Sequence, residues 1–138
     1  MSLVQQLEER LREYPHVHYT RTRHSIRIAP ADRNGFSVRA IEPGFGPRRR
    51  YRVRFEGWHG AFKTEREALD FVLFGLSPAC RLRVARRGGR PYEWIVECLE
   101  DAHWRVAGMS ARLFYRYWSR IEVLYYQNRL TPPDTHEV

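Results

Sequence analysis

The chain has 138 residues, of which 43% are hydrophobic and 29% are charged. This composition is typical of a folded globular protein and excludes a disordered or fibrous one. The net charge of +8 favours anionic partners, such as nucleic acid or an acidic protein.

The length is that of one domain, so we expect a single compact domain over residues 1–130 and a flexible C-terminal tail at 131–138. The N-terminal segment is charged and lacks the apolar block of a signal peptide. The longest apolar run, at 71–76, is far shorter than a membrane span of about 20 residues. These features predict a cytoplasmic protein with no membrane contact.

The basic residues are almost all arginine, because Lys63 is the only lysine among 24 basic residues. Such a preference is often a property of a GC-rich genome. Genome composition does not explain why the 24 basic residues exceed the 16 acidic ones. The sequence therefore leaves open whether the arginine excess is functional.

The first half of the chain predicts one helix followed by strands. Ser2 and Gln5 form a capping box, apolar residues follow at helical spacing, and Pro15 stops the pattern, which predicts a helix over about 2–13. Beyond it, apolar and polar residues alternate between turn segments, which indicates strands. These strands are 16–29, 36–40, 50–56 and a short strand that ends near Phe62.

The second half begins in the same way. Thr64 and Glu67 open a helix with a clear apolar stripe, and Gly75 and Pro78 are expected to end it. Strands are then predicted around 81–84, 93–98, 104–107 and 121–127, and residues 111–119 fit either a helix or a strand.

A hairpin is predicted where two of these strands flank an RGG sequence. A three-residue loop at 87–89 puts Gly89 at a left-handed position and Leu82 opposite Trp94. In that register Cys80 and Cys98 are diagonal neighbours, too far apart for a disulfide, so we expect buried free thiols. The absence of a CxxC motif excludes a zinc ribbon.

Together these elements predict an α+β fold. We expect an antiparallel sheet of about seven to eight strands with two helices packed on one face. The repeated order of elements suggests two α-β4 pseudo-repeat units, at 1–63 and 64–130.

Arginine residues are the strongest functional signal. Those on the predicted strands alternate with apolar residues and should point away from the helices, and others precede the strand at 50–56. Guanidinium groups suit phosphate because they donate paired hydrogen bonds and keep their charge. The alternative is a solvated face in which Glu56, Glu93 and Glu97 are cross-strand partners. The candidate residues for binding nucleic acid or another polyanion are Arg27, Arg39, Arg48, Arg49, Arg50, Arg52, Arg54, Arg81 and Arg83.

Trp58 and His59 lie between two glycines at a turn. An exposed tryptophan there would stack on a base, and the histidine would line a pocket. The alternative is a tryptophan that folds back over the edge of the core.

A protein-interaction module is the alternative function. The aromatic segment 113–126 would supply the contact surface of an inhibitor, adaptor or homodimer, without catalysis. We expect Ile121, Val123 and Tyr125 to close the core. The opposite, exposed set comprises Leu124 and Tyr126 with Gln127 and Asn128, and the candidate interface residues are Trp118, Leu124 and Tyr126.

Motifs for catalysis are missing: the chain has no nucleophile elbow, P-loop, dinucleotide fingerprint or HExxH sequence. His16, His18 and His24 share a predicted strand face. The HxH spacing of His16 and His18 can present two imidazoles to a metal, but no third ligand is identifiable. We therefore expect no catalytic residue, metal or cofactor. A third interpretation is a small-molecule pocket between helix and sheet, with His59 or His103 beside it. An active site without a linear motif also stays open.

Overall fold

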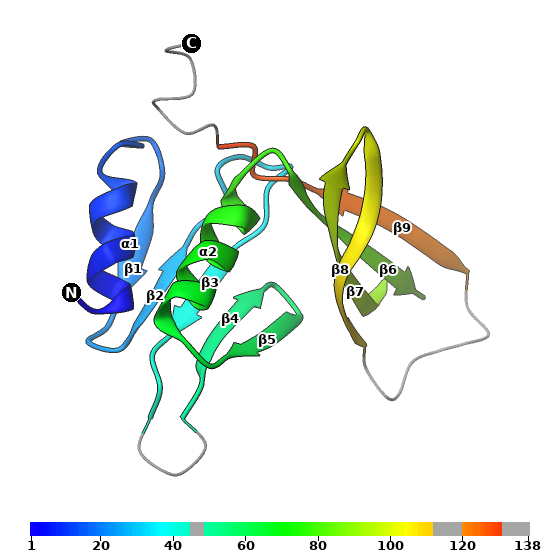
Figure 1. The fold of residues 1–138 in the computed structure, drawn as a ribbon. Coiled ribbons are helices and arrows are strands. Elements are labelled where there is room, and N and C mark those ends of the chain that lie inside the picture. Colours follow the sequence, from blue (N-terminus) through cyan, green and yellow to red (C-terminus); the bar gives the residue numbers. More distant parts are fainter. Residues whose placement is uncertain (45–48, 112–119, 131–138) are drawn as a thin grey trace.

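The computed structural model describes residues 1–44, 49–111 and 120–130. These residues form two helices and nine strands (Figure 1). In chain order the elements are α1 (Leu3–Leu11), β1 (Tyr19–Arg21), β2 (Ser25–Ile28), β3 (Val38–Ile41), β4 (Tyr51–Phe55), β5 (Trp58–Phe62), α2 (Glu65–Leu76), β6 (Cys80–Arg87), β7 (Arg90–Glu100), β8 (His103–Ala111) and β9 (Ile121–Tyr126).

The α+β class is as predicted, but the single sheet is wrong. The strands form two antiparallel sheets, ordered β1-β2-β3-β4-β5 and β8-β7-β6-β9. Five strands follow α1 and four follow α2, so the predicted α-β4 duplication is not confirmed. The sheets meet where β5 contacts β7 and β8.

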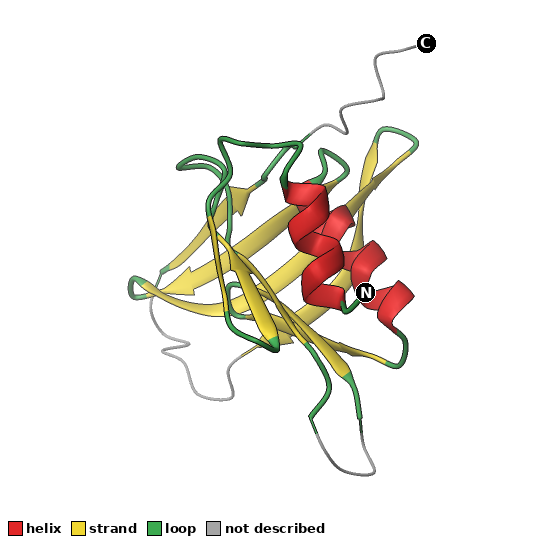
Figure 2. Cartoon of the chain, turned by 90° about the vertical axis from the view of Figure 1, so that its left-hand side faces the viewer, coloured by secondary structure: helices red, strands yellow, loops and turns green. Residues whose placement is uncertain are grey.

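Both helices begin where the sequence predicts. Ser2 and Gln5 make a reciprocal capping box at α1, and the Thr64 side chain accepts a hydrogen bond from the N–H of Glu67 at α2. The two helices cover one face of the first sheet (Figures 1 and 2). The core between them contains Leu3, Leu7, Ile26, Ile28, Val38, Val53, Phe55 and Val72, all with at most 1% of their surface exposed. Among the described residues, no helix covers the other face of this sheet.

The segment 16–29 is a hairpin rather than the single strand predicted. β1 and β2 pair with Tyr19 opposite Ile28. The Thr22 hydroxyl accepts hydrogen bonds from the N–H groups of His24 and Ser25, and these bonds close the turn. A threonine side chain thus reverses a segment that contains neither glycine nor proline at the turn.

The β6–β7 hairpin differs from the prediction in register. Gly88 and Gly89 both have positive φ angles and form a two-residue turn, so the three-residue loop is wrong. A bulge follows Ala85, and the combined effect places Leu82 opposite Val96 and Cys80 opposite Cys98. The two cysteines are free.

The two faces of β9 are the reverse of the prediction. Antiparallel pairing with β6 sets Tyr126 opposite Leu82, on the face that packs against the core. Ile121, Val123 and Tyr125 are exposed by 48%, 37% and 51%. Residues 112–119, which include Trp118, and the tail at 131–138 lie outside the described residues.

Candidate polyanion-binding surface

Three arginines lie in a row across the uncovered face of the first sheet. Arg27 on β2 is directly opposite Arg39 on β3, and Arg39 is directly opposite Arg54 on β4. All three side chains are exposed. Neighbouring strands are about 4.8 Å apart, so the row spans roughly 10 Å. We call these three residues the arginine ladder.

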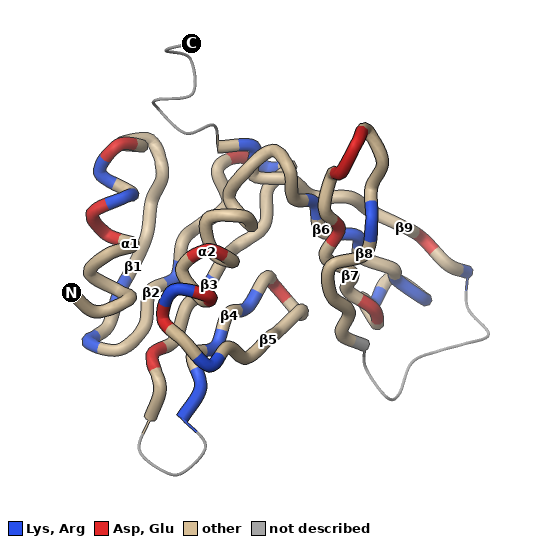
Figure 3. The backbone as a smooth tube through the Cα atoms, viewed as in Figure 1, with Lys and Arg blue, Asp and Glu red and all other residues tan. Residues whose placement is uncertain are grey.

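The orientation of the ladder follows from the alternation along each strand. The residues on either side of the ladder positions, such as Ile26, Val38 and Val53, are fully buried beneath the helices. Side chains of successive strand residues point to opposite faces, so the arginines must point away from the helices. Figure 3 shows basic positions on β2, β3 and β4.

The basic surface extends beyond the ladder on the side of β4 and β5. His59 on β5 is directly opposite Arg54 and is exposed. Arg52 lies two residues before Arg54 on the same face, opposite Ile41. The face therefore carries four guanidinium groups and one imidazole on four adjacent strands.

Within the described residues, no ion pair or hydrogen bond involves the side chain of Arg27, Arg39 or Arg54. Like charges placed directly opposite one another on a sheet destabilise it by a few tenths of a kcal/mol or more. Glu56, at the end of β4, uses one carboxylate oxygen to accept a hydrogen bond from the Ser37 N–H at 2.8 Å. The described residues therefore supply no counter-charge to offset the electrostatic repulsion among the three ladder arginines.

Arg81 and Arg83 do not belong to this surface. Both lie on β6 in the second sheet, and both have carboxylate partners: Arg81 pairs with Glu97 at 2.7 Å and Arg83 with Glu93 at 3.6 Å. The prediction that they join the other arginines on one face is wrong, because β6 belongs to a separate sheet. The alternative of cross-strand glutamate partners holds for these two arginines.

The environment of Arg81 shows a structural role. Its guanidinium lies 4.3 Å from the ring centroid of Trp104 and 4.3 Å from that of Tyr125. These rings come from β8 and β9, the two edge strands of the sheet. Arg81 therefore ties four strands together through cation–π contacts and its ion pair.

The structure describes two of the three arginines that directly precede β4. Arg49 and Arg50 are exposed, and a terminal nitrogen of Arg50 donates a hydrogen bond to the Arg49 carbonyl oxygen. Arg48 lies outside the described residues. Arg50 lies two residues before Arg52, as Arg52 does before Arg54, so it extends the basic face beyond the start of β4.

Trp58 is not a stacking surface for a ligand. Only 5% of it is exposed, and its ring lies 5.2 Å from that of Phe55 and 5.1 Å from that of Phe71. The indole faces inward because Trp58 directly opposes Phe55, whose side chain is in the core. His59, the next residue, points to the opposite face.

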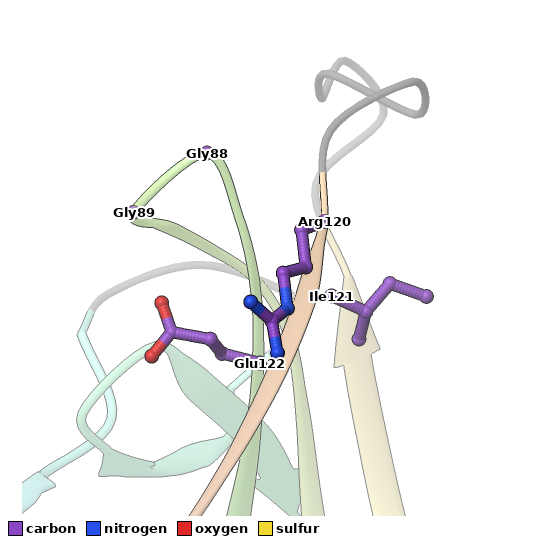
Figure 4. Close-up of a pocket in the computed structure, with 5 residues that line it drawn as sticks. All are labelled: Gly88, Gly89, Arg120, Ile121 and Glu122. Carbon is purple, nitrogen blue, oxygen red and sulfur yellow. The ribbon is translucent and has the colours of Figure 1, made fainter.

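A pocket of about 390 Å³ lies between the Gly88–Gly89 turn and the start of β9 (Figure 4). Arg120 and Glu122 line it with opposite charges, and Ile121 points away from them. The two charges of its lining cancel, so the pocket adds no charge-based candidate.

Among the described residues, no group of three or more His, Cys, Asp or Glu side chains is arranged to hold a metal ion. In the same residues, no helix has the length and apolar character needed to span a membrane. The sequence matches no protein-family model, and comparison with curated proteins and with solved structures gives no significant similarity.

Proposed function

We propose that the uncovered face of the first sheet binds the phosphate backbone of nucleic acid, with the arginine ladder as its centre. The observation that carries the proposal is the unpaired row of Arg27, Arg39 and Arg54 on three adjacent strands. A polyanion would supply the counter-charges that the described residues do not supply. Arg52 and the loop arginines Arg49 and Arg50 extend the same surface.

Phosphate contact without base recognition fits the composition of this face. Apart from His59, no ring-bearing residue of β2–β5 shares the side of the sheet that carries the ladder: the neighbours there are Ser25, Ile41 and Ala61. Base stacking on single strands requires aromatic side chains. Backbone contacts position a protein on nucleic acid but carry no sequence information. We therefore expect binding that does not depend on base sequence.

The test is a fluorescence-anisotropy titration of labelled single- and double-stranded oligonucleotides at about 50 and 300 mM salt. The variant replaces Arg27, Arg39 and Arg54 by Gln. A matched control replaces three other exposed arginines by Gln: Arg10, Arg12 and Arg33. Both triple variants lower the net charge by the same amount, so a difference between them reports the location of the charge.

We expect the ladder variant to bind at least about tenfold more weakly than the control at the lower salt, with a slope of log K against log salt reduced by roughly two to three. Equal losses of affinity in the two variants would mean that binding depends only on the net charge of the protein. No binding of the unmodified protein at the lower salt would overturn the proposal.

A second candidate function is self-association through the outer face of the second sheet. On this face the exposed apolar side chains come from three strands: Leu99, Val106, Met109, Ile121, Val123 and Tyr125. Most of them lie on the edge strands β8 and β9, on either side of the ion pairs of β6 and β7. Exposed apolar side chains beside polar ones are common in protein interfaces. This set replaces Leu124 and Tyr126 as candidate interface residues, because the side chains of those two residues face the core side of the sheet.

Sedimentation measurements test this candidate. Val106 and Met109 are exposed by 66% and 62%, and replacing both by Glu should convert a dimer to a monomer. Arg66→Glu, on the exposed side of α2, is the control and should leave the dimer intact. A monomeric unmodified protein at high concentration would rule out self-association.

A further inference from the structure

A pocket of about 290 Å³, which the sequence analysis did not predict, lies between the loops of the first sheet and the strands of the second. Phe36 lines it from the loop before β3 and Glu56 from the turn between β4 and β5. Val84, Arg86, Trp94 and Tyr126 line it from the second sheet. Its size is near the lower end of the range for small-molecule sites, about 300–1,000 Å³. The walls are apolar or aromatic, with one acidic and one basic side chain.

Arg86 is the unusual residue of this pocket. Its Nε–H is buried and has no hydrogen-bond partner among the residues that the structure describes. Glu122 is its direct cross-strand neighbour on β9, yet no ion pair joins the two in the described part of the chain. A buried donor without an acceptor costs free energy, and such groups in native structures call for a functional explanation.

The strand opposite Arg86 is irregular. The pairing of β6 with β7 shifts register between Ala85 and Arg86, and the extra residue, Tyr92, lies on β7. β6 itself pairs regularly with β9, so Arg86 shares a face with Leu82 and Val84. Bulges occur often beside functional sites.

The walls of the pocket are held in place by their surroundings. A Cβ atom on Gly57 would lie 2.1 Å from the Trp94 ring, so the indole packs directly against the glycine backbone. The N–H of Phe36 donates a hydrogen bond to Asn128 Oδ1 at 3.0 Å. Walls fixed by such contacts provide a preformed site, which lowers the entropic cost of binding.

Glu56 lines the pocket from the two-residue turn that joins Phe55 to Trp58. Its φ angle of 54° is the positive value that such hairpin turns require at their first position. One oxygen of its carboxylate is engaged by the Ser37 N–H. The negative charge disfavours a dianion such as a phosphate monoester, whereas a monoanion pays a smaller penalty.

We propose that this pocket binds a small aromatic monocarboxylate. The carboxylate pairs with the Arg86 guanidinium, and the aromatic ring packs among Trp94, Tyr126 and Val84. Arginine suits a planar carboxylate because its donors form two parallel hydrogen bonds. The pairing gives the Arg86 guanidinium the ionic partner that it lacks among the described residues.

Calorimetric titration with phenylacetate tests the proposal, with phenylacetamide and phenyl phosphate as the neutral and dianionic comparisons. We expect the unmodified protein to bind phenylacetate with a Kd below about 1 mM and both comparisons at least about tenfold more weakly. This comparison requires no variant. Equal affinity for phenylacetate and phenylacetamide, or no binding of phenylacetate up to about 5 mM, would overturn the proposal.

Arg86→Met removes the charged guanidinium and keeps an unbranched apolar side chain. We expect it to weaken phenylacetate binding at least about tenfold, which corresponds to the loss of one charge-assisted interaction. Arg83→Met, on the opposite face of the same strand, is the matched control and should bind as the unmodified protein does.

Thermal unfolding separates a ligand-binding role of Arg86 from a structural one. Removing an unsatisfied buried donor should raise Tm, so Arg86→Met is expected to be more stable while it binds less. The control Arg83→Met loses its pairing with Glu93 and should not gain stability. A fall in Tm for Arg86→Met together with unchanged phenylacetate affinity would mean that Arg86 serves the fold instead.

Discussion

The side chain of Asn128 donates a hydrogen bond to the carbonyl oxygen of Gly75 at 3.1 Å. The same side chain accepts one from the N–H of Phe36 at 3.0 Å. Gly75 is in the last turn of α2, and Phe36 is in the loop before β3. One buried amide therefore connects the chain after β9 to the helix and to the first sheet.

Asn128→Ala should destabilise the protein by roughly 2–4 kcal/mol, because it leaves a buried donor and a buried acceptor unsatisfied. Only 4% of the Asn128 surface is exposed, so water does not readily replace the amide. Urea unfolding measures the change. The exposed Asn34→Ala variant is the control and should stay within about 0.5 kcal/mol of the unmodified protein.

Arg81 and Arg39 should respond in opposite ways to replacement by Ala. Arg81→Ala removes an ion pair and two cation–π contacts, and we expect a loss of about 1–3 kcal/mol in the free energy of unfolding. Arg39→Ala removes a charge that faces two like charges, so stability should be unchanged or slightly higher. Chemical denaturation of the two variants in parallel makes the comparison. Equal losses in both would mean that Arg39 also has a structural role.

Gly75 should tolerate no side chain, although it lies inside a helix. A Cβ atom there would lie 2.2 Å from the Phe55 ring, which is fully buried. We expect Gly75→Ala to cost about 1–3 kcal/mol through overpacking, despite the higher helix propensity of alanine. Gly44→Ala provides the contrast, because nothing lies within 4 Å of its added Cβ atom. A stabilised Gly75→Ala variant would show that α2 moves away from β4 at little cost.

The Cys80 thiol should make stability dependent on pH in alkaline solution. Burial raises its pKa from 9.0 to about 12, with a smaller contribution from the neighbouring Cys98. The folded protein therefore holds this proton more tightly than the unfolded chain does. Stability is fully present below pH 9.0 and falls as the pH rises toward 12, by about 1.4 kcal/mol per pH unit.

Urea unfolding of the unmodified protein and of Cys80→Ala at about pH 8 and pH 10 isolates this effect. The difference in unfolding free energy between the two proteins should shrink at the higher pH, because only the unmodified protein loses the thiol proton on unfolding. A difference that does not change with pH would contradict the raised pKa. Cys98→Ala is the companion variant. Its thiol is less buried, and its pKa is raised by burial and by Glu100.

Local patterns in the sequence determined much of the fold. The capping residues Ser2 and Thr64 mark the starts of both helices, and the alternation in 50–56 predicts which face of β4 is buried. These features depend on residues close together in the chain, where propensity and periodicity act directly. The positions of most strands followed from the same kind of information, except at the Thr22 turn. The helix ends did not, because α1 ends at Leu11 and Gly75 lies inside α2.

The pairing of distant strands was decided only by the tertiary structure. Arg52 and Arg54 flank Val53, and Arg81 and Arg83 flank Leu82, so the two segments have the same local pattern. In the structure, β7 brings Glu93 and Glu97 beside the second pair, whereas β3 brings Arg39 opposite Arg54. The faces of β9 were likewise set by its register with β6. A strand's periodicity says which residues share a face, but the neighbouring strand decides whether that face is core, ion-paired or open to a ligand.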